Sequence, residues 1–157
     1  MSISPELAAL FRRDLTRLVQ ELSAFPEGSV WSVLPPITNS AGNLALHIEG
    51  NLREYIGRQL GNVAYGRQRN LEFSLRGLAK VELLGRLEVV KELIPGIVAG
   101  LSARQLDSIY PENVLGVPLS TRQFLVALYG HLNYHLGQID YLRRIVTQGA
   151  TIEFAGL

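Results

Sequence analysis

Cysteine is absent from this chain of 157 residues. Its absence excludes disulfide bonds, thiolate ligands for a metal and a cysteine nucleophile on the protein itself. Long apolar runs are also missing, because no uninterrupted run reaches the roughly 18 residues that a membrane helix needs. The N-terminal stretch MSISPELAALFRRDL carries charges within its first apolar run and has no cleavage-site pattern. We therefore expect a cytoplasmic protein that does not enter a membrane.

An excess of charge of one sign is lacking as well. Lysine and arginine number 15 and the acids 14, which gives a net charge of +1, and the two signs are interspersed. No basic stripe is present that would indicate nucleic-acid binding. Hydrophobic residues make up 47% of the chain. We expect one domain over residues 1–157, with a well-filled core and some apolar surface left for a partner chain.

Four segments repeat apolar residues every three or four positions, which is the pattern of amphipathic helices. They span about 5–24, about 39–60, a stretch that starts near 81, and about 121–148. Ser4 can cap the first helix. Ser120 and Gln123 form a capping box for the last helix, which Gly149 would end. Pro95 lies inside the third segment and predicts a kink or a break there.

The connection between the second and third helices, about residues 61–78, is long and only weakly periodic. A long connection lets two consecutive helices lie parallel, whereas a short one makes them antiparallel. No stretch of any length shows the alternating pattern of a β-strand, and no internal repeat is present. We therefore expect an all-α fold, a four-helix bundle.

Histidine is scarce, and two of the three histidines lie four residues apart on the last helix, as His131 and His135. At 100° per residue both fall inside the apolar face of that helix. Imidazoles at this spacing have Cβ atoms roughly 6 Å apart and can converge on one ion. If the second and last helices are neighbours, His47 reaches the same point. Three imidazoles with open coordination positions are the composition of a catalytic metal site.

The alternative is a cluster of hydrogen-bonded core histidines, since buried imidazoles need polar partners. Spacing alone leaves both interpretations open. Leu132 stands where a metalloprotease H-E-x-x-H motif has glutamate, so that class is excluded. No Glu-x-x-His occurs, which argues against a di-iron carboxylate bundle, and neither a G-x-S-x-G motif nor a Walker loop is present.

Other polar residues lie close to the histidines along their helices. Gln138 is near His135 and can orient a ligand histidine or a bound water, or simply bond to backbone. Asn51 and Tyr134 are weaker candidates of the same kind, beside His47 and His131. Gly50 is mid-helix, where glycine costs about 1 kcal/mol against alanine, so we expect a close helix approach or room beside a metal.

Several arginines lie in and before the long connection. They can bind a substrate carboxylate, but ordinary surface or loop-fixing ion pairs are the favoured interpretation. These residues are Arg53, Arg58, Arg67 and Arg69.

Three blocks resemble the DinB-like superfamily of helical-bundle metalloproteins, and more closely its uncharacterised branch DUF1572. They are NSAGNLALHIEGNLREYI (39–56), RQRNLEF (67–73) and HLNYHLGQI (131–139). Asn70 departs from the pattern, in which we expect aspartate. The resemblance implies a four-helix bundle with a long connection between helices 2 and 3. It also implies a divalent metal, zinc or nickel, on His47, His131 and His135, with water completing the shell.

The resemblance says less about the reaction. Some superfamily members are S-transferases that use bacillithiol or mycothiol, or isomerases of that kind. We therefore expect a metal-dependent transferase whose low-molecular-weight thiol comes with the substrate, because this chain has no cysteine. The alternative is a non-enzymatic, stress-related metal-binding bundle. A homodimer is expected from the family and the apolar surplus, and no catalytic residue is assigned.

Overall fold

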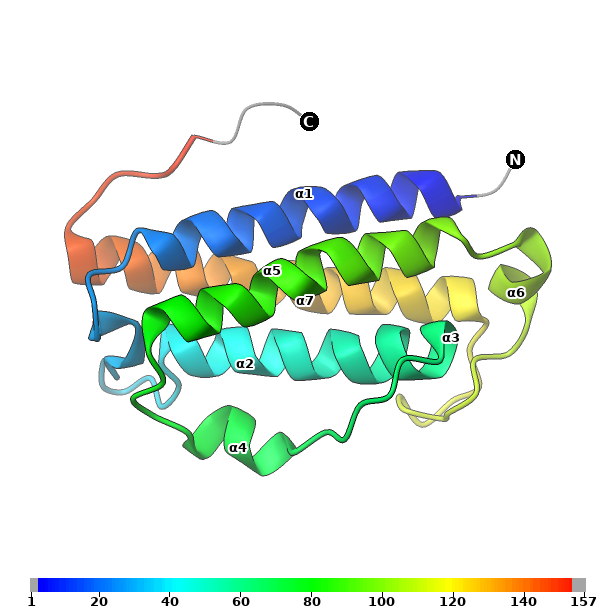
Figure 1. The fold of residues 1–157 in the computed structure, drawn as a ribbon, viewed down its shortest axis with the longest axis horizontal. Helices are drawn as coiled ribbons and strands as arrows, with labels where there is room; N and C mark the ends of the chain where they lie inside the picture. The colour runs from blue at the N-terminus through cyan, green and yellow to red at the C-terminus, as the bar shows by residue number, and fades with distance from the viewer. Residues whose placement is uncertain (1–2, 154–157) are drawn as a thin grey trace.

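Four long helices form the body of the protein in this computed structural model, which describes residues 3–153 (Figure 1). They are α1 (Ser4–Ser23), α2 (Ala41–Leu52), α5 (Lys80–Ala99) and α7 (Thr121–Thr147). Shorter elements lie between them: η1 (Ser29–Trp31), η2 (Arg53–Arg58), α3 (Gln59–Gly61), α4 (Arg69–Ser74) and α6 (Ala103–Asp107). No strand occurs between residues 3 and 153. The predicted all-α fold is confirmed.

The four long helices pack as a ring in which α1 lies between α5 and α7, and α2 lies between the same two helices. The chain runs in the same direction along α2 and α5 (Figure 1). This is possible because residues 62–79 return along the bundle, with α4 resting on α2. The parallel pair that the long connection predicts is therefore present.

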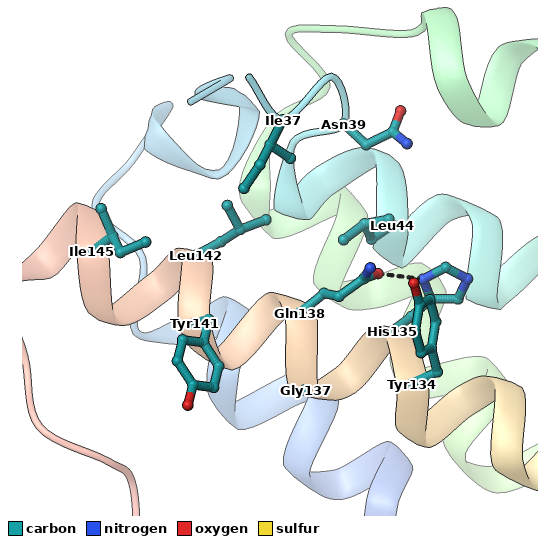
Figure 2. A pocket seen from close by; sticks show the side chains of 10 residues that line it. All are labelled: Ile37, Asn39, Leu44, Tyr134, His135, Gly137, Gln138, Tyr141, Leu142 and Ile145. Atoms are coloured by element: carbon teal, nitrogen blue, oxygen red, sulfur yellow. Dashed lines mark hydrogen bonds between the residues drawn. The ribbon is translucent and has the colours of Figure 1, made fainter. Parts of the chain in front are cut away.

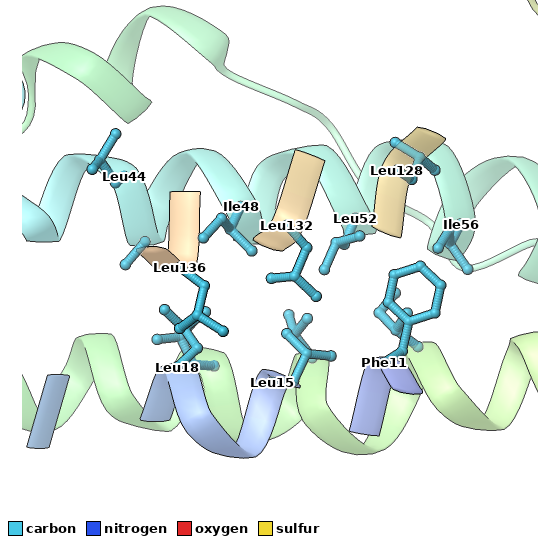
Figure 3. Packing of buried hydrophobic residues seen from close by; sticks show 14 of the residues in the cluster. Phe11, Leu15, Leu18, Leu44, Ile48, Leu52, Ile56, Leu128, Leu132 and Leu136 are labelled. Atoms are coloured by element: carbon cyan, nitrogen blue, oxygen red, sulfur yellow. The ribbon is translucent and has the colours of Figure 1, made fainter. Parts of the chain in front are cut away.

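The core lies between the inner faces of the helices, where leucine dominates (Figure 3). Residues three or four apart reach one face of a helix, so the sequence periodicity becomes a continuous apolar interior. Each fully buried large apolar side chain contributes about 1.5–3 kcal/mol. Typical members are Phe11, Leu15 and Leu18 of α1, Ile48 and Leu52 of α2, and Leu132 and Leu136 of α7.

Local capping signals set the starts of two of the four long helices. Ser40 and Asn43 form a capping box before α2, and Ser120 and Gln123 form the predicted one before α7. The predicted cap at Ser4 is wrong. Ser4 lies within α1, and its hydroxyl donates to the Leu101 carbonyl at 2.7 Å, because a partner across the bundle is within reach.

Two other helix predictions need correction. Of the kink or break predicted at Pro95, the break is absent, because α5 continues as one helix to Ala99. The kink stays a prediction. Proline removes one backbone hydrogen bond, whereas Ile94, Pro95 and Val98 are all buried in the core and hold the helix in place. Helix α7 ends through Gln148, which has a left-handed φ of 52°, so Gly149 is not the residue that turns the chain.

The second predicted helix, about 39–60, is one helical run whose pitch changes along its length. Helix α2 continues into η2, a π-helix, and then into α3. The hydroxyl of Tyr110 donates to the Tyr55 carbonyl at 2.8 Å, which gives this wider turn an outside partner. No helix within residues 3–153 has both the length and the apolarity to span a bilayer. The predicted single domain, 1–157, extends beyond the described residues and stays a prediction.

Candidate metal centre

The three histidines meet at the interface between α2 and α7. His47 lies in the middle of α2 and is 7% exposed, whereas His131 and His135 on α7 are half-buried. Nε2 of His131 lies 3.2 Å from Nε2 of His47 and 3.1 Å from Nε2 of His135. One ligand atom from each histidine lies within 4.8 Å of the other two. The structure thus brings together the three residues that the sequence singles out.

The histidines of α7 lie at the edge of its buried face. Leu128, Leu132 and Leu136 occupy the centre of that face and are almost fully buried. The prediction that His131 and His135 sit inside the apolar stripe therefore needs correction. Their position at the edge matters chemically, because ligand nitrogens there can face both a partner helix and a solvent-accessible space.

Glu72 of α4 orients His47. Its Oε2 lies 2.8 Å from Nδ1 of His47, and Arg67 donates two hydrogen bonds to the same carboxylate, at 2.7 and 3.0 Å. Burial alone would raise the pKa of Glu72, but the hydrogen bonds from His47 and Arg67 outweigh it and lower the pKa below its usual value. A carboxylate that accepts from Nδ1 leaves the Nε2 lone pair of His47 pointing at the other histidines.

The close approach of α4 to α2 depends on two residues of α2. The Asn43 side chain donates to the carbonyls of Glu72 and Leu75, at 3.0 and 3.1 Å. A Cβ atom at Gly50 would lie 2.1 Å from Oε1 of Glu72, so a side chain there would displace the carboxylate. The mid-helix glycine is explained by this approach.

Gln138 holds the third histidine. Its Oε1 lies 2.7 Å from Nδ1 of His135, an interaction drawn as a dashed line in Figure 2. Tyr134 is 65% exposed and meets the His135 ring edge-on, with centroids 5.1 Å apart. Asn51 lies away from these contacts, in a hollow described below. Among residues 3–153, Gln138 is the one of the three predicted supporting residues that forms a hydrogen bond with a histidine of the site.

Counting the N–H donors and acceptors of the three imidazoles shows whether they suit a metal ion. His47 and His135 donate Nδ1–H to Glu72 and Gln138, so the Nε2 atom of each ring is an acceptor. Neutral His131 has one N–H group that it can donate to them. Burial, followed by the charges of His135 and His47, lowers the pKa of His131 to about 4, and burial lowers the pKa of His135. The single N–H of His131 cannot serve both Nε2 acceptors, whereas a metal cation can bind the Nε2 atoms of all three histidines.

The nitrogen spacing also suits a metal. A tetrahedral zinc ion with Zn–N bonds of about 2.0–2.1 Å separates its ligand nitrogens by about 3.3 Å. The separations of 3.1 and 3.2 Å are close to that value. The residues present therefore fit a divalent metal held by three imidazoles.

Two hollows border the histidines. The first, which we call the apolar hollow, has a volume of about 610 Å³ and reaches His135 and Gln138 (Figure 2). The second, which we call the arginine hollow, has a volume of about 250 Å³ and reaches His47 and His131. The apolar hollow is lined by Ile37, Asn39, Leu44, Tyr134, His135, Gly137, Gln138, Tyr141, Leu142 and Ile145. The ligand nitrogens are thus approached from two sides.

Sequence reasoning missed Glu72, whereas Arg67 forms a loop-fixing ion pair of the kind favoured for the arginines, with Glu72 as its partner. Two features of the sequence could have indicated Glu72: the glutamate in the block RQRNLEF and the mid-helix glycine Gly50. No periodic pattern relates these two positions to each other. The favoured interpretation of the other arginines fits two of them. Arg53 pairs with Glu49, and Arg58 pairs with Glu54. Arg69 behaves differently and stacks on Phe73, with its guanidinium carbon 5.3 Å from the ring centroid.

Comparison with known proteins gives matches at the level of the fold. No family model and no curated protein matches this chain. A conserved protein from Enterococcus faecalis superposes with a TM-score of 0.75, covering 95% of this chain and 99% of that one at 15% identity. A DinB-like protein from Bacillus cereus has a TM-score of 0.68, covering 92% and 91% at 16% identity. The predicted DUF1572 branch stays a prediction, and the chain has the fold of a DinB-like helical bundle.

Proposed function

We propose that this protein binds one divalent metal ion, zinc or nickel, through the Nε2 atoms of His47, His131 and His135. The observation that carries the proposal is the convergence of these three atoms, with the Nδ1 atoms of His47 and His135 tied to Glu72 and Gln138. Imidazole suits both metals. Three protein ligands leave a position for water or substrate, as in catalytic rather than structural zinc sites.

We further propose that the site serves a group transfer from a low-molecular-weight thiol. When bound, the ion would lower the pKa of a coordinated thiol or water. The chain's own residues hold the imidazoles in place, and the apolar hollow provides a largely apolar surface beside His135. In the transfer the thiol sulfur bonds to an electrophilic carbon, the bond to the leaving group breaks with its electron pair, and the thiol proton passes to solvent.

The presence of two hollows supports a reaction between two small molecules. The apolar hollow reaches His135 and the arginine hollow reaches His47 and His131, so each molecule has its own approach to the histidines. A purely structural ion would be enclosed by four protein ligands.

Metal analysis of the untagged protein tests the metal proposal. We expect about one zinc or nickel ion per chain, lost in His131→Ala and retained in the exposed control Tyr134→Phe. Chelation should lower the melting temperature of the wild-type protein but not that of His131→Ala. A metal-free protein whose melting temperature ignores both added zinc and chelator would falsify the proposal.

A non-enzymatic metal-binding bundle that acts as a homodimer is the second candidate. It is favoured by a row of exposed apolar side chains on α7, namely Val126, Tyr134, Tyr141 and Ile145. Such a row is a common feature of surfaces that bind another protein. Sedimentation of the metal-loaded protein distinguishes this candidate: a monomer at all concentrations contradicts it, whereas a dimer that Tyr141→Glu dissociates supports it.

A further inference from the structure

The arginine hollow contains polar groups that the metal site does not use. His47 and His131 line it, and no acidic side chain of the described residues does. Arg67 and Arg69 also line it, so the hollow favours an anion. Its walls are otherwise largely apolar, formed by Tyr55, Val114, Leu115, Phe124, Ala127 and Leu128.

Asn51, which lines this hollow, has a side-chain oxygen without a hydrogen-bond partner among the described residues. The residue is only 8% exposed, and its Oδ1 has no hydrogen-bond partner within residues 3–153. Buried carbonyl oxygens are normally paired, because an unmet one loses its hydration without compensation. An apolar residue at this position would avoid that loss. Because Asn51 lines the hollow, a turn of its amide would bring Oδ1 to an N–H or O–H group of a bound molecule.

Arg69, which lines the same hollow, has a guanidinium group without an ion-pair partner among the described residues. Its neighbour Arg67 is committed to Glu72 by two hydrogen bonds. Arg69 is exposed, stacks on Phe73, and has no carboxylate within ion-pairing distance among the described residues. A planar guanidinium held against an aromatic ring is suited to bind a carboxylate through two parallel hydrogen bonds.

We propose that the arginine hollow binds a small carboxylate that also carries an N–H or O–H donor and an apolar group. The carboxylate binds Arg69, the donor binds Oδ1 of Asn51, and the apolar group packs against Phe124 and Leu128. A volume of about 250 Å³ equals that of roughly eight water molecules at about 30 Å³ each, which suits a ligand the size of an acylated amino acid.

This proposal rests on the proposed function in one respect, since it names the substrate class of the metal site. The bound molecule presents its reacting end to His47 and His131, which line the hollow. Its contacts with Arg69 and Asn51 do not include a metal ligand. Binding can therefore be measured separately from metal content.

N-acetyl-L-leucine is a suitable probe because it has a carboxylate, an N–H donor and an apolar side chain. Two related compounds each lack one group: N-acetyl-L-leucinamide lacks the carboxylate, and 4-methylpentanoate lacks the acetamido group that carries the N–H donor. In calorimetric titration of the purified protein we expect N-acetyl-L-leucine to bind at least about tenfold more tightly than either compound. Equal affinity for the acid and its amide, or no binding up to about 10 mM acid, overturns the proposal.

Variants assign the contacts. Arg69→Gln should weaken binding of the acid about tenfold or more and leave binding of the amide and the metal content unchanged, whereas the exposed control Arg104→Gln should change none of them. Asn51→Leu should remove the preference for N-acetyl-L-leucine over 4-methylpentanoate. If that variant does not fold, the preference measured on the wild-type protein still decides whether a donor is recognised.

The two proposals fail in different ways. A protein that carries metal but does not bind the acid contradicts the carboxylate site alone. A metal-free protein that binds the acid through Arg69 contradicts the metal proposal alone. Unchanged binding of the acid by Arg69→Gln overturns the assignment of the hollow whatever the metal content.

Discussion

Glu72 accepts a hydrogen bond from Nδ1 of His47 at 2.8 Å, and this contact connects the short helix α4 to an imidazole that faces both histidines of α7. The carboxylate is buried and is also held by Arg67. An imidazole held in this way has its ring orientation and its tautomer set by a group outside the metal site. The connection between the second and third long helices thus takes part in shaping the candidate metal centre.

Glu72→Gln should weaken metal binding by about 10- to 100-fold, because a neutral amide orients His47 less strongly than a carboxylate. Competition with a chromophoric chelator measures the affinity. Glu82→Gln, at an exposed acid in the first turn of α5, is the matched control and should leave affinity unchanged. An affinity equal to wild type in Glu72→Gln would show that the carboxylate does not support the site.

Gly50→Ala should also weaken metal binding, since the new Cβ would lie 2.1 Å from Oε1 of Glu72 and force the carboxylate away. Helix propensity alone favours alanine by about 1 kcal/mol, so a gain in stability is the expectation without this contact. Gly85→Ala on α5 is the control, because a Cβ there meets no atom within 4 Å. Thermal unfolding should show stabilisation for Gly85→Ala and loss of stability for Gly50→Ala. Equal stabilisation of both would contradict the close approach.

We expect the buried carboxylate of Asp14 to stabilise the fold at neutral pH and to lose this effect in acid. Burial acts to raise its pKa, but hydrogen bonds from Arg13 and Tyr129, at 2.8 and 2.6 Å, bring the pKa below its usual value. A folded-state pKa below the unfolded one gives stability that is present above about pH 3.9 and lost as the pH falls through the folded value. Urea unfolding of wild type and Asp14→Asn should therefore differ most at neutral pH and converge in acid. A constant difference across that range speaks against the shift.

The ion pair between Glu21 of α1 and Arg143 of α7 is almost fully buried. Arg143→Met leaves the Glu21 carboxylate without its cation and should cost about 3–5 kcal/mol in the free energy of unfolding. Adding Glu21→Leu should restore most of that loss, because two apolar side chains can replace a buried pair. Chemical denaturation measures both variants. A double variant as unstable as the single one would show that the pair itself is needed.

Most of the helical framework could be predicted from sequence because the signals are local. Apolar residues three and four apart specify which face of each helix is buried, and Ser120 with Gln123 marks the start of α7 within a single turn. Predictions from local sequence were wrong where contacts with distant residues outweigh the local preference for a helix cap or a helix break. Ser4 bonds to Leu101 instead of capping α1, and core packing carries α5 through Pro95.

The sequence by itself determined the pairing of His131 with His135, because a helix places residues four apart on one side. Only the tertiary structure decided the rest of the site. His47 and Glu72 are 25 residues apart, and they meet because Asn43 and Gly50 let α4 settle on α2. The block RQRNLEF contains Glu72, but no spacing in the weakly periodic connection relates it to His47. Contacts within one helical turn follow from spacing, whereas contacts between segments depend on how the whole chain packs.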